Sequence, residues 1–199
     1  MVVLAFCASL LALEGCTVSA GAQETPPPSK VAEVLERRSG EFDLTRPPDR
    51  TEVGMPEGLE YVDYQRDDHQ PFHVVFALPE GKRLELDVSL LGFDSYGAAQ
   101  PATAPPTGAD VHHYPATPEA ARDHLLAAAA QFGFDPTPVA EWYRQTTGPA
   151  PAGSPTLRTL WMTTRIGYLQ MSVQARYDWP YDTPESAQVV VHYVLSLQP

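Results

Sequence analysis

The sequence feature that most restricts the fold is a strict alternation of apolar and polar residues in two stretches of the chain. From Arg83 to Leu90, leucine or valine occupies every second position and a polar residue stands between. The same pattern recurs from Leu169 to Arg176. Because side chains of a β-strand point alternately to its two faces, this pattern predicts strands with one face in the core. We therefore expect Leu86 and Val173 to be buried.

Further strands are expected where aromatic and β-branched residues concentrate between turn-forming residues. These stretches are Leu59–Arg66, Phe72–Leu78, Leu157–Thr164 and Val189–Leu197. The last of them carries apolar residues at both alternating sets of positions, which predicts a central strand covered on both faces. The segment from Gly92 to Tyr114 is rich in proline and is expected to be a long loop, a kind of segment that is often functional.

Three helices are expected, each bounded by residues that favour helix ends. They run from Ser29 to Gly40, from Thr117 to Gly133 and from Thr137 to Gly148. Serine and threonine cap the first turn of a helix, proline is tolerated just inside it, and glycine commonly follows the last turn. The first of these segments has apolar residues three and four positions apart, which predicts one buried face.

The order of these elements is one helix, three strands, two helices and three strands. Short connections within each group of strands favour antiparallel pairing. We therefore predict an α+β fold: an antiparallel sheet of about six strands in two three-strand groups, with two central helices and one N-terminal helix packed on it. Residues 30–199 are expected to form a single domain, because a chain of this length can bury a sizeable core.

The first thirteen residues are almost wholly apolar and end shortly before a cysteine. A helix needs about 20 residues to cross the hydrocarbon core of a bilayer, so this run is too short to span it and is typical of a signal peptide. The residues before the cysteine are Leu13, Glu14 and Gly15, and the polar, proline-rich segment Thr17–Ser29 follows it. An alternative is that the apolar run is a buried helix or strand of the domain.

This junction resembles the processing site of secreted bacterial lipoproteins. In that family an aliphatic residue precedes the cysteine by three positions and a small residue stands next to it, as Leu13, Gly15 and Cys16 do here. Glu14 departs from the pattern. The resemblance implies a signal peptide at residues 1–15, a lipid on Cys16 and a tether at residues 16–29. No Lys or Arg precedes the apolar run, so we expect translation to begin upstream of Met1.

Composition narrows the class of partner. The formal net charge is −12, with 25 acidic and 13 basic residues, so phosphate backbones should be repelled and we expect no nucleic-acid partner. The chain has two cysteines, so Cys16 is the one left after cleavage and no internal disulfide is expected. A single isoleucine, two lysines and no asparagine resemble the composition of proteins from high-G+C Gram-positive bacteria.

Two pairs of histidines, one of them close to carboxylates, are candidate metal ligands. His69 and His73 stand near Asp67 and Asp68. In a strand, residues four apart lie about 13 Å from each other, which is too far to share a zinc ion. His112 and His113 would point to opposite sides of an extended chain. We therefore expect no metal site at either pair.

Recognised catalytic and cofactor motifs are missing from the sequence. It contains no G-x-S-x-G elbow, no phosphate-binding loop and no dinucleotide fingerprint, so no cofactor is expected. An alternative is a hydrolase with an unfamiliar site in the 92–114 loop, where Asp94 and Ser95 precede His112 and His113. That hypothesis requires these side chains to converge in a pocket.

The most unusual local composition is the aromatic and acidic cluster in the turn before the last strand. Tyr177, Asp178, Trp179 and Tyr181 combine rings with hydrogen-bond acceptors, which suits sugar faces or a protein partner. The alternative is that the rings close one end of the core. We name these four residues as candidate ligand contacts.

Taken together, these features favour a lipid-anchored protein on the extracytoplasmic face of the cell membrane. The expected role is non-enzymatic binding of an envelope protein or glycan, with the membrane contacted through the N-terminal lipid. Besides the hydrolase, a carrier of lipid or glycolipid stays open as an alternative, and it would require a large apolar cavity between helices and sheet.

Overall fold

The structure is a computed structural model that describes residues 29–66, 68, 70–149, 156–178 and 188–197. The helices are α1 (Lys30–Arg37), α2 (Pro118–Phe132) and α3 (Thr137–Thr146), with a 3-10 turn at Pro79–Gly81. The strands are β1 (Ser39–Asp43), β2 (Tyr61–Gln65), β3 (Phe72–Ala77), β4 (Arg83–Val88), β5 (Leu90–Asp94), β6 (Gly108–His113), β7 (Thr156–Arg158), β8 (Met162–Ile166), β9 (Leu169–Asp178) and β10 (Gln188–Ser196). Within this part of the chain, no helix is long and apolar enough to cross a membrane. The predicted α+β class is confirmed.

The strands form two sheets instead of the single sheet that was expected. A three-stranded sheet has the order β1-β3-β4, and a seven-stranded sheet has the order β2-β5-β6-β10-β9-β7, with β8 also paired to β9. Every pairing in the larger sheet is antiparallel, whereas β1 runs parallel to β3. The prediction that the last strand is central is confirmed, because β10 lies between β6 and β9. The prediction that it is covered on both faces was wrong for much of its length, because His192 and Val194 are only half-buried.

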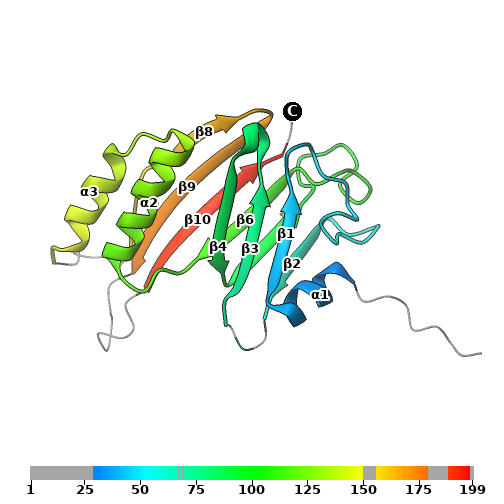
Figure 1. Ribbon diagram of the computed structural model, residues 1–199, viewed down its shortest axis with the longest axis horizontal. Helices are drawn as coiled ribbons and strands as arrows, with labels where there is room; N and C mark the ends of the chain where they lie inside the picture. Colours follow the sequence, from blue (N-terminus) through cyan, green and yellow to red (C-terminus); the bar gives the residue numbers. More distant parts are fainter. Residues whose placement is uncertain (1–28, 67, 69, 150–155, 179–187, 198–199) are drawn as a thin grey trace, which may run out of the picture.

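The smaller sheet and the helices α2 and α3 cover the same face of the seven-stranded sheet, side by side (Figure 1). We call this the inner face. The Phe42 ring of β1 lies 5.5 Å from that of Tyr64 and 5.1 Å from that of Phe93, both on the inner face. On the helical side, His124 of α2 contacts Tyr193 of β10. The opposite side of the seven-stranded sheet is its outer face.

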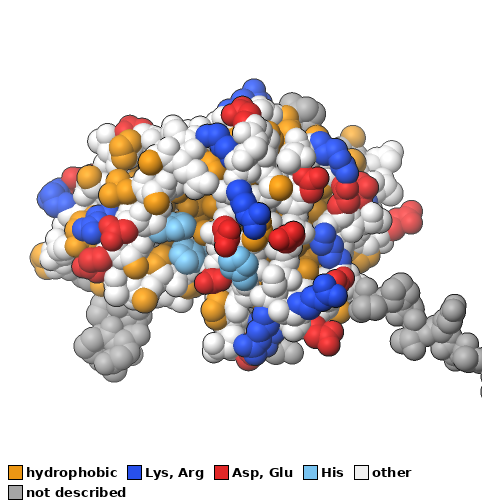
Figure 2. All heavy atoms as spheres, viewed as in Figure 1, with side chains coloured by type: hydrophobic (Ala, Val, Ile, Leu, Met, Phe, Trp, Pro, Cys, Tyr) orange, Lys and Arg blue, Asp and Glu red, His pale blue; other side chains and the backbone are white. Residues whose placement is uncertain are grey.

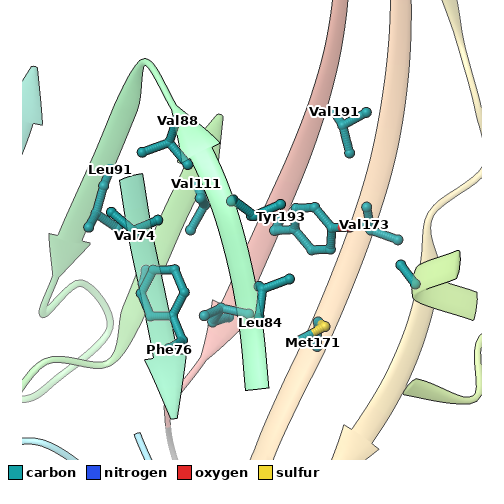
Figure 3. Close-up of a cluster of buried hydrophobic side chains, with 14 of the residues drawn as sticks. Val74, Phe76, Leu84, Val88, Leu91, Val111, Met171, Val173, Val191 and Tyr193 are labelled. Atoms are coloured by element: carbon teal, nitrogen blue, oxygen red, sulfur yellow. The ribbon is translucent and has the colours of Figure 1, made fainter. Parts of the chain in front are cut away.

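The core lies between the two sheets and beneath α2. Val74 and Phe76 of β3, Val111 of β6 and Tyr193 of β10 belong to one buried cluster (Figure 3), and all four side chains are fully buried. Along β6 and β10, buried residues alternate with half-buried ones, because successive side chains of a strand point to opposite faces. The half-buried set forms the outer face.

The alternation in residues 83–90 identified a real strand but not its end. Leu86 and Val173 are 4 % and 0 % exposed, as predicted. The strand stops at Val88, and the Ser89 N–H donates to a carbonyl of β6, so the chain crosses there from the smaller sheet to the larger one. Leu90 therefore begins β5 on the outer face and is half-buried, outside the core.

The expected loop from Gly92 to Tyr114 is confirmed only in its middle, at residues 95–107. Its two ends were assigned wrongly, because they belong to β5 and β6, which pair with each other in antiparallel register. Ala109 and Val111 are buried, and they alternate with half-buried polar residues. This short period-two pattern was masked by the prolines that precede it.

Helix ends follow the predicted capping residues in part. The Ser29 hydroxyl accepts the Ala32 N–H at 3.2 Å, and Thr117 and Gly133 bound α2 as expected. However, α1 ends at Arg37 and is capped by Arg38, not by Gly40. Gly40 lies within β1, where a Cβ atom would come 3.0 Å from Val34, so its missing side chain lets α1 pack closely on the strand.

Candidate functional site

The catalytic residues proposed for the 92–114 segment do not converge. Ser95 is fully buried: its backbone N–H donates to the Glu60 carbonyl, and its hydroxyl donates to the Pro101 carbonyl. His112 points to the outer face, whereas the His113 Nδ1 bonds the Asp87 carbonyl on the inner side at 2.7 Å. A serine held by two carbonyls and histidines on opposite faces supply no nucleophile with an adjacent base.

His73 lies between two carboxylates of the smaller sheet. Its Nδ1 lies 3.0 Å from an Asp87 oxygen, and its Nε2 lies 3.2 Å from a Glu85 oxygen. Asp67 and His69 lie outside the described residues. Within the part of the chain that the structure describes, no group of three or more histidine, cysteine or acidic side chains is placed to hold a metal ion.

The two described residues of the aromatic and acidic cluster, Tyr177 and Asp178, lie on opposite sides of the sheet at the end of β9. Tyr177 packs against the core on the inner face. Asp178 points the other way and pairs with Arg176, with 3.0 Å between the Arg176 Nε and a carboxylate oxygen. Trp179 and Tyr181 lie outside the described residues, as does the expected lipidation site Cys16. Tyr177 and Asp178 thus do not share one surface.

A different set of rings meets on the outer face. Trp161, His192, His112 and Tyr114 form a continuous row, with successive centroid distances of 5.7, 4.5 and 6.4 Å. We call these four residues the ring row. Its two ends are open to solvent, because Trp161 is 49 % exposed and Tyr114 is 39 % exposed.

Strand register builds the ring row from three separate segments. His112 of β6 lies directly opposite His192 of β10, and His192 lies opposite Gln174 of β9. Trp161 immediately precedes β8, on the far side of β9. Asp110, two residues before His112 and on the same face, is bonded to the His192 Nε2 at 2.7 Å. This bond fixes the orientation of the central imidazole.

A pair of tyrosines borders the ring row across β5. Tyr61 of β2 lies flat over Gly92, where a Cβ atom would come 2.3 Å from the tyrosine hydroxyl oxygen. Its ring stacks with that of Tyr96, with centroids 6.5 Å apart and planes nearly parallel. Because glycine has no side chain, Tyr61 can reach across the strand toward Asp110. Burial, followed by the charges of Asp63 and Asp110, raises the pKa of Tyr61.

The electrostatic character of this face follows from partial burial of its ionisable groups. Burial, followed by the neighbouring His192, lowers the pKa of His112, so this imidazole is neutral at neutral pH. Burial also raises the pKa of Asp94, and the charge of Asp110 adds to that effect. The face therefore combines rings, a neutral imidazole and carboxylates, which together can donate and accept hydrogen bonds next to apolar surface.

A second group of titratable side chains lies on the inner side, in a groove between α2 and β4. The groove has a volume of about 310 Å³ and is lined by Arg83, Leu84, Glu85, His124, Ala127, Ala128, Gln131, Phe132 and Tyr193. Figure 2 shows histidine side chains between α2 and the smaller sheet on this face. The Nε2 of His124 lies 2.7 Å from the Tyr193 hydroxyl oxygen. Burial, followed by the nearby His113, lowers the pKa of His124 to about 4.

Neither group was identified from the sequence. The ring row joins residues that are far apart in the chain, and the pairing of β6 with β10 cannot be inferred from either strand alone. One local signal was available, because Asp110, His112 and Tyr114 alternate with Ala109 and Val111. That pattern marks a polar face on a half-buried strand.

Comparisons of this chain with protein-family models, with curated proteins and with solved structures gave no match.

Proposed function

We propose that this protein is a lipid-anchored cell-envelope protein whose folded domain binds a neutral glycan on the outer face of its seven-stranded sheet. The ring row is the observation that carries the binding role. The resemblance of Leu13, Gly15 and Cys16 to a lipoprotein processing site supports attachment to the extracytoplasmic face of the membrane.

The chemistry of the outer face suits a sugar polymer. Pyranose rings present an apolar face of C–H groups and a rim of hydroxyls, so they stack on aromatic rings and bond to polar groups at the edges. Trp161 and Tyr114 supply exposed rings at the two ends of the row. Asp110 and His192 lie between them and can bond hydroxyls. An elongated row fits several linked sugar units better than one small molecule.

Charge favours a neutral polymer over an anionic one. The chain carries a net charge of −12, and Asp63, Asp94 and Asp110 lie on this face near Tyr61. Phosphate-containing or uronic acid polymers would be repelled by these carboxylates. Part of the face is closed, because Val190 is 4 % exposed. The open part centres on the ring row.

Glycan binding is tested by retention on insoluble neutral polysaccharides. The full chain, purified in detergent, is mixed with β-glucan, galactan or mannan particles and the unbound fraction is measured. We expect at least one particle to retain the protein, and the double variant Trp161→Ala, Tyr114→Ala to lose about tenfold in affinity, because two stacking surfaces are removed. Leu160→Ala is the matched control, since it removes a 77 % exposed apolar side chain next to Trp161. Equal retention of wild type and double variant would refute the assignment of this face.

Attachment is tested separately. Wild-type protein exported by a bacterial host should be recovered in the membrane fraction with a diacylglyceryl group on Cys16, and Cys16→Ala should not be lipidated. Mass spectrometry of the processed N-terminus distinguishes the two. An unmodified Cys16 in mature wild-type protein would exclude the anchor and leave the binding role to be judged by the retention assay.

A further inference from the structure

The edge of β4 that faces α2 has main-chain groups free of strand pairing. On the other side of β3, the His73 N–H donates to the Arg38 carbonyl and the Ala77 carbonyl accepts the Leu44 N–H, so these β3 residues bond toward β1. In the pairing of β3 with β4, His73 lies opposite Asp87 and Ala77 lies opposite Arg83. Because His73 and Ala77 bond toward β1, Asp87 and Arg83 direct their own N–H and C=O groups away from β3, to the free edge of β4.

Side chains occupy this edge at two places and leave the middle unoccupied. The Gln131 Nε2 donates to the Arg83 carbonyl at 2.7 Å, and the His113 Nδ1 bonds the Asp87 carbonyl at 2.7 Å. Glu85 lies halfway between Arg83 and Asp87 along β4. It pairs with Val75 in the same alternation, so its N–H and C=O also point to the free edge of β4. No hydrogen bond among the described residues uses the main chain of Glu85. One N–H and one C=O are therefore presented side by side along the groove.

The groove beside Glu85 offers a further polar group and an apolar floor. His124 lines it and contacts the Tyr193 hydroxyl through Nε2. A neutral imidazole whose Nε2 accepts that proton carries its own proton on Nδ1, and none of the described residues bonds that atom. Leu84, Ala128 and Phe132 are buried residues that supply apolar lining. The volume of about 310 Å³ suits a small molecule.

We propose that this groove is a second binding site, for a small neutral ligand that carries a dipeptide-like unit, with an amide N–H and an amide C=O attached to the same carbon atom. The C=O of this unit accepts the Glu85 N–H, and its N–H donates to the Glu85 C=O, which reproduces the two bonds of an antiparallel strand pair. The His124 Nδ1–H bonds a further acceptor of the ligand, and its apolar substituent lies against Leu84 and Phe132. Main-chain hydrogen bonds thus supply recognition of the amide, and the floor selects a small side group.

This site is independent of the outer face. It lies on the inner side of the seven-stranded sheet, and none of the ring-row residues lines it. Glycan retention and amide binding can therefore succeed or fail separately.

The test uses N-acetyl-L-alanine methylamide as the probe and the imidazole NMR signals of the full chain as the readout. We expect a saturable shift of the His124 signals at about millimolar concentration, the usual range for a ligand of this size. The control probe, N-acetyl-N-methyl-L-alanine methylamide, lacks the alanine N–H that bonds the Glu85 C=O, so it should bind about tenfold more weakly. Absence of a saturable shift, or equal binding of the two probes, would overturn the proposal.

Two matched variants of α2 locate the binding. Ala127 is exposed at the rim of the groove and Ala130 is exposed on the same helix outside it. Leucine favours helix at both positions, so both variants should fold. Ala127→Leu fills the groove and should weaken amide binding about tenfold or more, whereas Ala130→Leu should leave it unchanged. Equal effects of the two variants would place the probe elsewhere and contradict the site.

Discussion

The two faces of the seven-stranded sheet are made from the same strands but differ in what they contact. The inner face carries Leu91, Val111 and Tyr193, which are fully buried under the smaller sheet and α2. The outer face carries Leu90, His112 and His192 at neighbouring positions, all half-buried. Residues at alternate positions of one strand thus have different roles: one set packs in the core, and the other forms the surface of the outer face. A substitution can alter one function and leave the other intact, and the predictions below use neighbouring residues to test this separation.

The largest difference is expected between Leu91→Ala and Leu90→Ala. Leu91 is fully buried in the core, so its truncation should lower the free energy of unfolding by about 2–5 kcal/mol. Leu90 points to the outer face, and its truncation should cost about 1 kcal/mol or less. Urea midpoints with unchanged slopes measure both values. Similar losses for the two variants would mean that the outer face is covered as well as the inner one.

The second prediction concerns acid stability and His124. Its pKa in the folded protein is about 4, below the unfolded value of 6.5, so the unfolded state binds the proton more tightly. The contribution of the neutral imidazole is therefore complete above pH 6.5 and is lost as the pH falls toward 4. By pH 5 the loss should reach about 2 kcal/mol.

His124→Gln is the matched variant for this measurement. Glutamine does not titrate, so the difference in unfolding free energy between wild type and variant should change by that amount between pH 7 and pH 5. Carboxylates that titrate in both proteins cancel in the difference. A constant difference across this range would show that the inner-face imidazole is not buried as described.

The third prediction concerns the contact that positions Tyr61. A methyl group at Gly92 would collide with the Tyr61 hydroxyl, so Gly92→Ala should displace the ring from Tyr96 and cost about 1–2 kcal/mol. Gly148→Ala is the control, because the nearest atom is the Gln145 carbonyl oxygen at 3.4 Å. Thermal or urea unfolding of both variants gives the comparison. If Gly92→Ala were as stable as the control, Tyr61 would not lie across β5.

The smallest expected change in stability is that of Trp161→Ala. This side chain is 49 % exposed at the end of the ring row, so its removal should lower the unfolding free energy by about 1 kcal/mol or less. Urea unfolding in parallel with Leu91→Ala provides the contrast. A loss as large as that of Leu91→Ala would make Trp161 part of the core and remove it from the proposed binding surface.

Sequence patterns predicted the inner face better than the outer one. The alternation along β4 and β9 identified buried leucines and valines, and Thr117 with Gly133 bounded α2 correctly. A strand with one buried face has an apolar residue at every second position, and a helix cap involves residues of a single turn. Both features can therefore be recognised within a few residues of sequence. The class of fold followed from the order of these signals.

The outer face and the second sheet left weaker signals. The ring row depends on the register between β6, β10 and β9, and two helices and two strands separate β6 from β9 in the chain. β1 has glycine at Gly40 and charged neighbours, so its five residues do not resemble a strand. Local composition indicated Tyr177, Asp178, Trp179 and Tyr181 as candidate ligand contacts, but alternation along β9 directs Tyr177 and Asp178 to opposite faces. Contacts that arise from pairing between distant strands cannot be deduced from local composition.

The most direct test of this separation of roles is an NMR titration of the imidazole signals with oligosaccharides from the retained polysaccharide. The chain has six histidines, and two neighbouring pairs report on opposite faces: His112 and His192 outside, His113 and His124 inside. We expect the signals of His112 and His192 to shift with saturation while those of His113 and His124 stay fixed. Shifts confined to His113 and His124 would contradict the account and move the glycan site to the inner side.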